Sequence, residues 1–180
     1  MSLVGMPGSG KSTAGRLLSR RLNLPFVDSD HAIEARIGCT IREFFEREGE
    51  QRFRDVEQET LADLTAGDAG VIATGGGSVL REANRNALRQ AGVVVYLRAT
   101  PEELWRRLAR DTQRPLLQVA DPHARLRQLF AERDPLYRET AHFVIHTGRP
   151  SVPAMVDMIQ MQLELAGLVS GPGGPAGTAA

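Results

Sequence analysis

Short apolar runs alternate with longer amphipathic stretches along most of this chain. Runs of aliphatic and β-branched residues predict five strands, at Leu3-Val4, Phe26-Val27, Val71–Ala73, Val93–Leu97 and Phe143–Ile145. Between these runs, apolar residues recur every three or four positions, which is typical of helices that bury one face. A strand followed by a helix, repeated five times, predicts a five-stranded parallel sheet with helices on both faces, that is, a three-layer α/β/α fold.

The same pattern gives approximate limits for the helices. Two of them begin with capping boxes, at Thr40-Ile41-Arg42-Glu43 and at Thr100-Pro101-Glu102-Glu103. Gly49 separates two helical pieces, and in the second the apolar stripe Phe53, Val56, Thr60, Leu61, Leu64 puts Arg54 beside the buried face. A solvated arginine is the alternative at that position. The other helices are expected at 12–22, 31–38, about 82–90, 126–130 leading to Asp134-Pro135, and 152–163.

One stretch between the first strand and the first helix carries a specific motif. Gly5-Met6-Pro7-Gly8-Ser9-Gly10-Lys11-Ser12-Thr13 satisfies G-x-x-x-x-G-K-[ST], the P-loop pattern. Glycines let successive backbone N–H groups curl around phosphates, and the following helix points its N-terminus at the same phosphates. The motif therefore predicts a P-loop NTPase fold and nucleotide binding. Its phosphate-binding residues are expected to be Gly8, Ser9, Gly10, Lys11, Ser12 and Thr13.

Two residues of this loop have individual roles in the predicted chemistry. Lys11 is expected to bridge the β- and γ-phosphates of a nucleoside triphosphate, and the Ser12 hydroxyl is expected to ligate Mg²⁺. Lys11 is also the only lysine among the 22 basic residues of the chain. A compact ammonium fits between phosphates where a guanidinium fork does not.

Two aspartates close the second predicted strand. Because side chains alternate along a strand, Asp28 and Asp30 face the same way at its carboxyl end, where open α/β sheets bind ligands. Asp30 could instead only cap the helix that begins at His31. On these residues alone both interpretations stay open.

Two further segments resemble ligand-binding loops. Gly75, Gly76 and Gly77 directly follow a buried strand, and three consecutive glycines are costly to order, so a close approach of backbone to ligand is the better explanation. At residues 111–122 the helical periodicity is lost, and the segment contains Arg114. It is expected to be a mobile lid over phosphates, with an ordinary surface loop as the alternative.

Composition narrows the class of protein. The 180 residues suggest one compact domain at 1–167, followed by a disordered tail rich in glycine, proline and alanine at 168–180. The formal charge of zero predicts no general attraction for nucleic acid or membranes. Cys39 is the only cysteine and is expected to be buried or half-buried, and the histidines lack zinc-ligand spacing. With no signal peptide or membrane span in the pattern, a cytoplasmic protein is expected.

In this order, the motifs resemble one family, shikimate kinase, from the nucleoside-monophosphate-kinase-like branch of P-loop proteins. The resemblance runs from about Leu3 to Leu165. Besides the P-loop and the glycines 75–77, it is carried by Phe26-Val27-Asp28-Ser29-Asp30, Gly49-Glu50-Gln51-Arg52-Phe53-Arg54, Arg114-Pro115-Leu116-Leu117 and Pro135-Leu136-Tyr137-Arg138. Two features depart from the family: few residues precede the P-loop, which suggests an earlier natural start and a weak sheet edge, and the tail has no family counterpart.

The resemblance implies an activity and roles for the nucleotide-binding residues. The activity is Mg²⁺-assisted transfer of the ATP γ-phosphate to the 3-hydroxyl of shikimate, a step of aromatic amino-acid biosynthesis. Lys11 and the loop amides would hold the phosphates, while Ser12 and Asp28 would belong to the metal shell. Arg114 would reach the transferring phosphoryl group from the lid. Arg107 and Arg149 are weaker candidates for contacts that flank the adenine.

The resemblance also implies a substrate site. Asp30 would contact the reacting hydroxyl as a base or as an orienting group. Arg54 and Arg138 would hold the substrate carboxylate, and Gly75, Gly76 and Gly77 would line its ring. A monomer that binds only the small molecules shikimate and ATP is expected. Two arginines at one end and a carboxylate at the other match the polarity of a carboxylated polyol.

Other functions remain as alternatives. The loop also resembles that of adenylate kinase, but that family usually has glycine after the lysine, where this chain has Ser12, and no Asp-Gly-x-Pro-Arg segment follows. A gluconate kinase is disfavoured by the surroundings of Arg54 and Gly76. A catalytically silent nucleotide-binding module would not need both Asp30 and Arg114.

Overall fold

A computed structural model describes residues 1–67, 70–108, 121–148 and 150–169. Within these residues the chain forms a five-stranded sheet in the order β2-β3-β1-β4-β5, and every neighbouring pair is parallel. The strands are β1 (Ser2–Val4), β2 (Phe26–Asp28), β3 (Val71–Ala73), β4 (Val94–Arg98) and β5 (Phe143–His146). The predicted five-stranded parallel sheet is confirmed.

The first strand lies at the centre of the sheet, not at an edge. β1 has only three residues, but it pairs with β3 on one side and with β4 on the other. Leu3 and Val4 are fully buried. The concern about a weak sheet edge was therefore wrong: a strand that is bonded on both sides needs little length of its own, because its backbone groups find partners on two neighbours.

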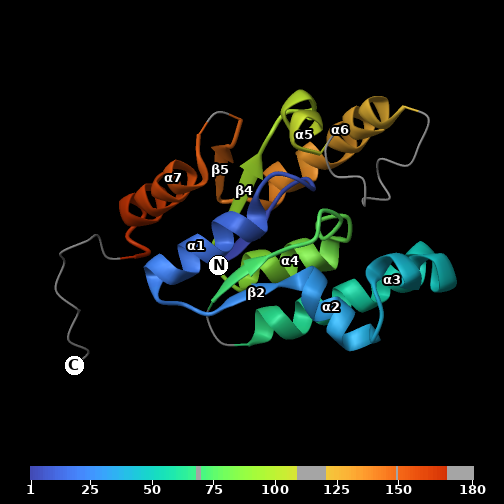
Figure 1. The fold of residues 1–180 in the computed structure, drawn as a ribbon. Coiled ribbons are helices and arrows are strands. Elements are labelled where there is room, and N and C mark those ends of the chain that lie inside the picture. The colour runs from blue at the N-terminus through green and yellow to red at the C-terminus, as the bar shows by residue number, and fades with distance from the viewer. Residues whose placement is uncertain (68–69, 109–120, 149, 170–180) are drawn as a thin grey trace.

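Seven described helices cover the sheet (Figure 1). They are α1 (Lys11–Leu22), α2 (Ser29–Ile37), α3 (Ile41–Ala66), α4 (Glu82–Gln90), α5 (Pro101–Leu108), α6 (Pro122–Thr140) and α7 (Val152–Leu165). One face packs Leu3, Val95 and Leu97 against α1 and α7. The other packs Val4, Val94 and Tyr96 against α3–α6. The alternation of side chains along β1 and β4 thus produces the three layers.

A third, smaller core joins α2 to α3. It contains Ile33, Phe44, Phe53 and Val56. The predicted break at Gly49 is present as a kink inside α3, where φ is 81°. Figure 1 shows these two helices extending to one side of the sheet. α2 contacts β2, while α3 packs against α4 and joins the main core through Leu61, in the half of the helix that carries Arg54.

Several local predictions are confirmed. Thr40 and Glu43 form a reciprocal capping box, and Thr100 and Glu103 bond each other in the same way. The helix predicted to lead to Asp134-Pro135 continues through the proline to Thr140. A proline removes one backbone hydrogen bond, and burial of Leu129 and Tyr137 on either side of it keeps the helix intact.

No helix in the described parts of the chain is both long and apolar enough to cross a membrane.

Candidate active site

A cavity of about 360 Å³ opens at the carboxyl ends of the central strands. Three segments enclose it: the P-loop after β1, the two aspartates after β2, and the loop after β3. Its lining residues are Pro7, Gly8, Gly10, Lys11, Ser12, Thr13, Asp28, Asp30, Thr74 and Gly76. The parallel topology brings these segments to one edge of the sheet, which is where ligands bind in such folds.

The P-loop has the backbone conformation that phosphate binding requires. Gly8 and Gly10 have φ values of 81° and 94°, a region that favours glycine. A Cβ on Gly8 would also lie 2.9 Å from the Leu108 side chain. Lys11 is buried, and its ammonium donates hydrogen bonds to the carbonyls of Gly5 (2.8 Å) and Met6 (2.9 Å). Ser9 is fully buried, while its neighbours Gly8 and Gly10 line the cavity.

Ser12 and Asp28 lie together at the floor of the cavity. The Ser12 hydroxyl donates a hydrogen bond of 2.6 Å to Oδ2 of Asp28. A hydroxyl and a carboxylate are hard oxygen ligands of the kind that Mg²⁺ accepts beside phosphate and water. No group of three or more His, Cys, Asp or Glu side chains gathers as a metal site within the described residues. The pair fits a metal that takes most of its ligands from the nucleotide.

Asp28, not Asp30, caps helix α2. Oδ1 of Asp28 accepts a hydrogen bond from the backbone N–H of Asp30 at 3.1 Å. The interpretation of Asp30 as a mere cap is therefore wrong, and its carboxylate points into the cavity instead. Burial raises the pKa of Asp30, and the neighbouring Asp28 raises it further, while Lys11 partly opposes both. Such a carboxylate is a better proton acceptor than an exposed one.

Arg54 lies under the glycine loop and is mostly buried. Its side chain is 12% exposed and bonds Oε2 of Glu57 at 2.6 Å. The alternative of a solvated arginine is therefore wrong. Glu57 is itself buried, and burial raises the pKa of its carboxyl, an effect that the Arg54 guanidinium offsets only in part. The guanidinium also lies 5.1 Å from the centre of the Phe53 ring. These contacts hold Arg54 in one orientation.

The glycine loop is packed closely on these side chains. A Cβ on Gly75 would lie 2.5 Å from Oδ1 of Asp30, and one on Gly76 would lie 2.6 Å from Pro7. A Cβ on Gly77 would collide with the Arg54 guanidinium. The three glycines thus pack closely on the side chains of Asp30, Pro7 and Arg54. Their close approach to a ligand stays a prediction.

Sequence reasoning chose Arg138 on α6 and missed Arg133. Arg138 is about half exposed and bonds Asp134 at 2.7 Å, on the side of the helix that faces Arg98. Arg133 is buried, donates to the Gly76 carbonyl at 3.0 Å, and has a buried Nε for which the described residues offer no partner. Arg133, and not Arg138, thus contacts the glycine loop, whose Gly76 lines the cavity.

A signal for Arg133 was present in the chain. It occupies the same helical stripe as Leu126, Leu129 and Tyr137, which are all buried. An arginine on an apolar stripe must find a polar partner inside the protein.

Of the remaining predicted arginines, Arg107 lies within the described residues. Arg107 on α5 donates to the carbonyl of Gly8 at 3.3 Å and to the hydroxyl and carbonyl of Thr147. It therefore lies at the rim of the P-loop. Arg114 and Arg149 lie outside the described residues, as do residues 111–120 of the expected lid and 170–180 of the expected tail.

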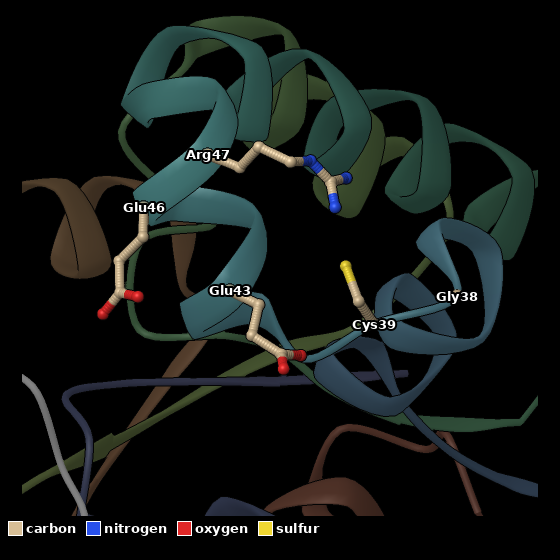
Figure 2. A pocket seen from close by; sticks show the side chains of 5 residues that line it. All are labelled: Gly38, Cys39, Glu43, Glu46 and Arg47. Carbon is tan, nitrogen blue, oxygen red and sulfur yellow. The ribbon is translucent and has the colours of Figure 1, made fainter.

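A larger hollow of about 630 Å³ lies elsewhere, at the turn between α2 and α3 (Figure 2). It is lined by Gly38, Cys39, Glu43, Glu46 and Arg47. Figure 2 shows the Cys39 sulfur pointing toward the Arg47 guanidinium, with the two glutamates around the opening. Cys39 is half-buried, as expected. Two carboxylates beside one arginine do not make a phosphate site, so the smaller cavity is the candidate active site.

Comparisons with known proteins agree with this choice. Residues 7–164 match the family model for shikimate kinase. Shikimate kinases of Paracidovorax citrulli and Burkholderia thailandensis are 60% and 57% identical to the chain, over 92% and 94% of its length and 92% of each of theirs. The structure of the shikimate kinase from Acinetobacter baumannii in complex with shikimate is 46% identical, with a TM-score of 0.87 over 92% of both chains.

Proposed function

Because the chain belongs to the shikimate kinase family, we propose that its cavity binds ATP and shikimate and transfers the γ-phosphate to the 3-hydroxyl. The products are 3-phosphoshikimate and ADP, in the biosynthesis of aromatic amino acids. One observation carries this proposal: the P-loop and Asp30 line one cavity with Gly76, and Arg54 and Arg133 lie against the glycine loop that contains Gly76. Phosphoryl transfer needs mainly such positioning and electrostatic stabilisation.

The nucleotide side of the cavity consists of the P-loop and its rim. The loop N–H groups and the N-terminus of α1 hold the phosphates, and Lys11 contacts the β- and γ-phosphates. Arg107, anchored to the Gly8 carbonyl and to Thr147, borders the base. Arg149 is proposed to flank the base as well, and Arg114 to reach the transferring phosphoryl group.

Ser12 and Asp28 are proposed to hold Mg²⁺ together with the ATP phosphates, since they supply a hydroxyl and a carboxylate 2.6 Å apart. When bound, the metal neutralises charge that develops on the phosphate oxygens.

Asp30 is proposed to orient the attacking hydroxyl and to accept its proton. It lies across the cavity from the P-loop, and its raised pKa suits a proton acceptor. Oxygen of the hydroxyl attacks the γ-phosphorus while the bond to the ADP oxygen breaks, and the hydroxyl proton passes to the carboxylate. Gly75 leaves room for the Asp30 side chain at this position.

Arg54 and Arg133 are proposed to bind the shikimate carboxylate. Both are buried, both lie against the glycine loop, and each can give charge-assisted hydrogen bonds. Arg133 replaces Arg138 in this role, because Arg138 is directed toward Asp134. The glycines 75–77 then pass between the two arginines and line the substrate ring.

A coupled ADP-release assay with shikimate, AMP and gluconate in parallel tests this function. We expect Mg²⁺-dependent turnover with shikimate alone. Equal turnover with AMP or gluconate would favour the other small-molecule kinases. ATP binding without any turnover would favour a silent nucleotide-binding module.

We further propose that the protein acts as a monomer in the cytoplasm. The cavity is built from one chain, so it needs no second copy to be complete. Light scattering at assay concentration tests the monomeric state. A measured mass equal to that of a dimer would contradict it.

A further inference from the structure

The carbonyl of Gly76 is held by two side chains of helix α6. The Tyr137 hydroxyl donates a hydrogen bond to it at 2.5 Å, and Nη1 of Arg133 donates at 3.0 Å. Its neighbours in the loop are bonded differently: the carbonyl of Gly75 accepts from Ser78 N–H, and that of Gly77 accepts from Leu80 N–H. Gly76 is therefore the one peptide of the described glycine loop that α6 holds from outside.

Tyr137 is rigid and remains a hydrogen-bond donor. It is fully buried, and its ring stacks on Tyr96 with centroids 4.9 Å apart. Burial raises the pKa of Tyr137, so the phenol stays protonated at neutral pH. Arg133, Glu57 and Arg54 are the charged groups near it, and none removes its proton.

The direction of this carbonyl determines where the next N–H points. The described peptide bonds are all trans, and in a planar trans peptide the N–H of one residue points opposite to the C=O before it. Since the Gly76 carbonyl points at α6, the N–H of Gly77 points away from α6. Within the described residues this N–H has no hydrogen-bond partner.

We infer that Tyr137 is a positioning residue for the substrate site: its hydroxyl fixes the Gly76–Gly77 peptide so that the Gly77 N–H is presented to bound shikimate. This inference rests on the proposed function for the identity of the ligand. Tyr137 touches neither phosphate nor substrate, and it acts through the peptide. Glycine loops are conformationally permissive, so a peptide without this anchor would populate other orientations.

The chain offers a matched control in Tyr96. The two tyrosines stack on each other and both lie in the same core, but the Tyr96 hydroxyl bonds Asp134 at 2.8 Å instead of the glycine loop. Tyr137→Phe and Tyr96→Phe each remove one buried hydroxyl and keep the stacked rings. Their costs to folding are therefore expected to be similar, and melting temperatures will show whether they are.

The experiment compares both variants with the wild-type protein in steady-state kinetics and in calorimetric titration with shikimate. We expect Tyr137→Phe to raise the KM and Kd for shikimate roughly three- to tenfold, the range for one net hydrogen bond, with the KM for ATP unchanged. Tyr96→Phe should leave both substrate constants unchanged. Unaltered shikimate binding in Tyr137→Phe, or an equal loss in Tyr96→Phe, would overturn the inference.

A second measurement needs no substrate. The ¹H–¹⁵N signal of the Gly77 amide should shift in Tyr137→Phe and stay in place in Tyr96→Phe, because only the first variant frees the Gly76–Gly77 peptide. An unmoved Gly77 signal in Tyr137→Phe would overturn the positioning role. If the wild-type protein did not phosphorylate shikimate, the proposed function would be wrong. The Gly77 signal would still show whether the Tyr137 hydroxyl fixes the Gly76–Gly77 peptide.

Discussion

Asp30 combines two properties that oppose each other. Its carboxylate must be ionised to accept a proton, but burial and the nearby Asp28 raise its pKa and so disfavour the ionised form. The folded protein therefore holds Asp30 in a state that costs stability at neutral pH. Such a cost is common where a site is built for activity.

Asp30→Asn is predicted to separate these two properties. Turnover should fall by about 10²–10⁴, the usual contribution of a general base, with ATP affinity retained. Stability should rise at pH 7, because the raised pKa in the folded state makes the ionised group unfavourable above it. That gain should shrink as the pH falls through the folded pKa and vanish below the unfolded pKa, where Asp30 is protonated in both states. Kinetics and urea unfolding between pH 4 and 8 measure both effects. A stability gain that did not depend on pH would contradict this account.

Arg133 and Arg138 of α6 provide a second prediction. Arg133→Ala should weaken shikimate binding about ten- to a hundredfold, as loss of a charge-assisted contact of roughly 1.5–3 kcal/mol implies, and Arg54→Ala should act alike. Arg138→Ala is the control, since Arg138 is about half exposed and pairs with Asp134. Titration of shikimate and ATP against all three variants decides between them. A loss of shikimate affinity in Arg138→Ala, with none in Arg133→Ala, would favour Arg138 as the residue that binds the carboxylate.

The sequence predicted the placement of those site residues that lie close to a strand end along the chain. Asp28 ends β2 and Asp30 lies two residues later, while Lys11 and Ser12 are joined to β1 by the short P-loop, so the placement of all four depends on a few residues of backbone. Arg133 could not be placed in this way, because its position depends on how α6 packs against the glycine loop, 57 residues earlier in the chain. A pattern shows that an arginine is on a buried stripe, but not which carbonyl it meets.

At the scale of elements, the glycine loop after β3 shows what sequence could and could not indicate. Three glycines predicted a close approach of backbone to a ligand, and the structure shows these glycines packed closely on side chains. The sequence does not show which side chains the loop contacts, namely Asp30, Pro7 and Arg54, because this depends on the packing of α2 and α3 against the sheet. The continuation of α6 through Pro135 has the same origin, because tertiary burial outweighs a local helix-breaking preference.

Gly75→Ala is predicted to disturb the site while leaving the fold. The new Cβ would lie 2.5 Å from Oδ1 of Asp30, so the carboxylate must move, and we expect turnover to fall by at least about tenfold. Gly67→Ala is the control: φ there is −80°, and its nearest neighbour atom would be 3.7 Å away. That variant should keep full activity and gain slightly in stability. Equal kinetics in the two variants would show that Asp30 tolerates displacement.

At the scale of the whole molecule, the class of fold was predictable and the order of its strands was not. Alternation of strands and helices implies a parallel sheet, because parallel neighbours need crossover connections. The central position of β1 depends on pairing with β3 and β4, about 70 and 90 residues later in the sequence. This order matters for function, since it puts the P-loop between the two aspartates on one side and α5 and α6 on the other.

Because these elements converge on one cavity, both ligands should stabilise the fold as a whole. A ligand at a hundred times its Kd adds about 2.7 kcal/mol, and a protein of this size gains roughly 2–4 °C per kcal/mol, so each ligand should raise Tm by about 5–10 °C. Lys11→Ala should lose the shift from Mg²⁺ and ATP but keep that from shikimate, because Lys11 lies on the phosphate side. Arg133→Ala should show the reverse. Thermal unfolding with each ligand alone tests this, and the loss of both shifts in either variant would mean that the two halves of the cavity are not separate binding sites.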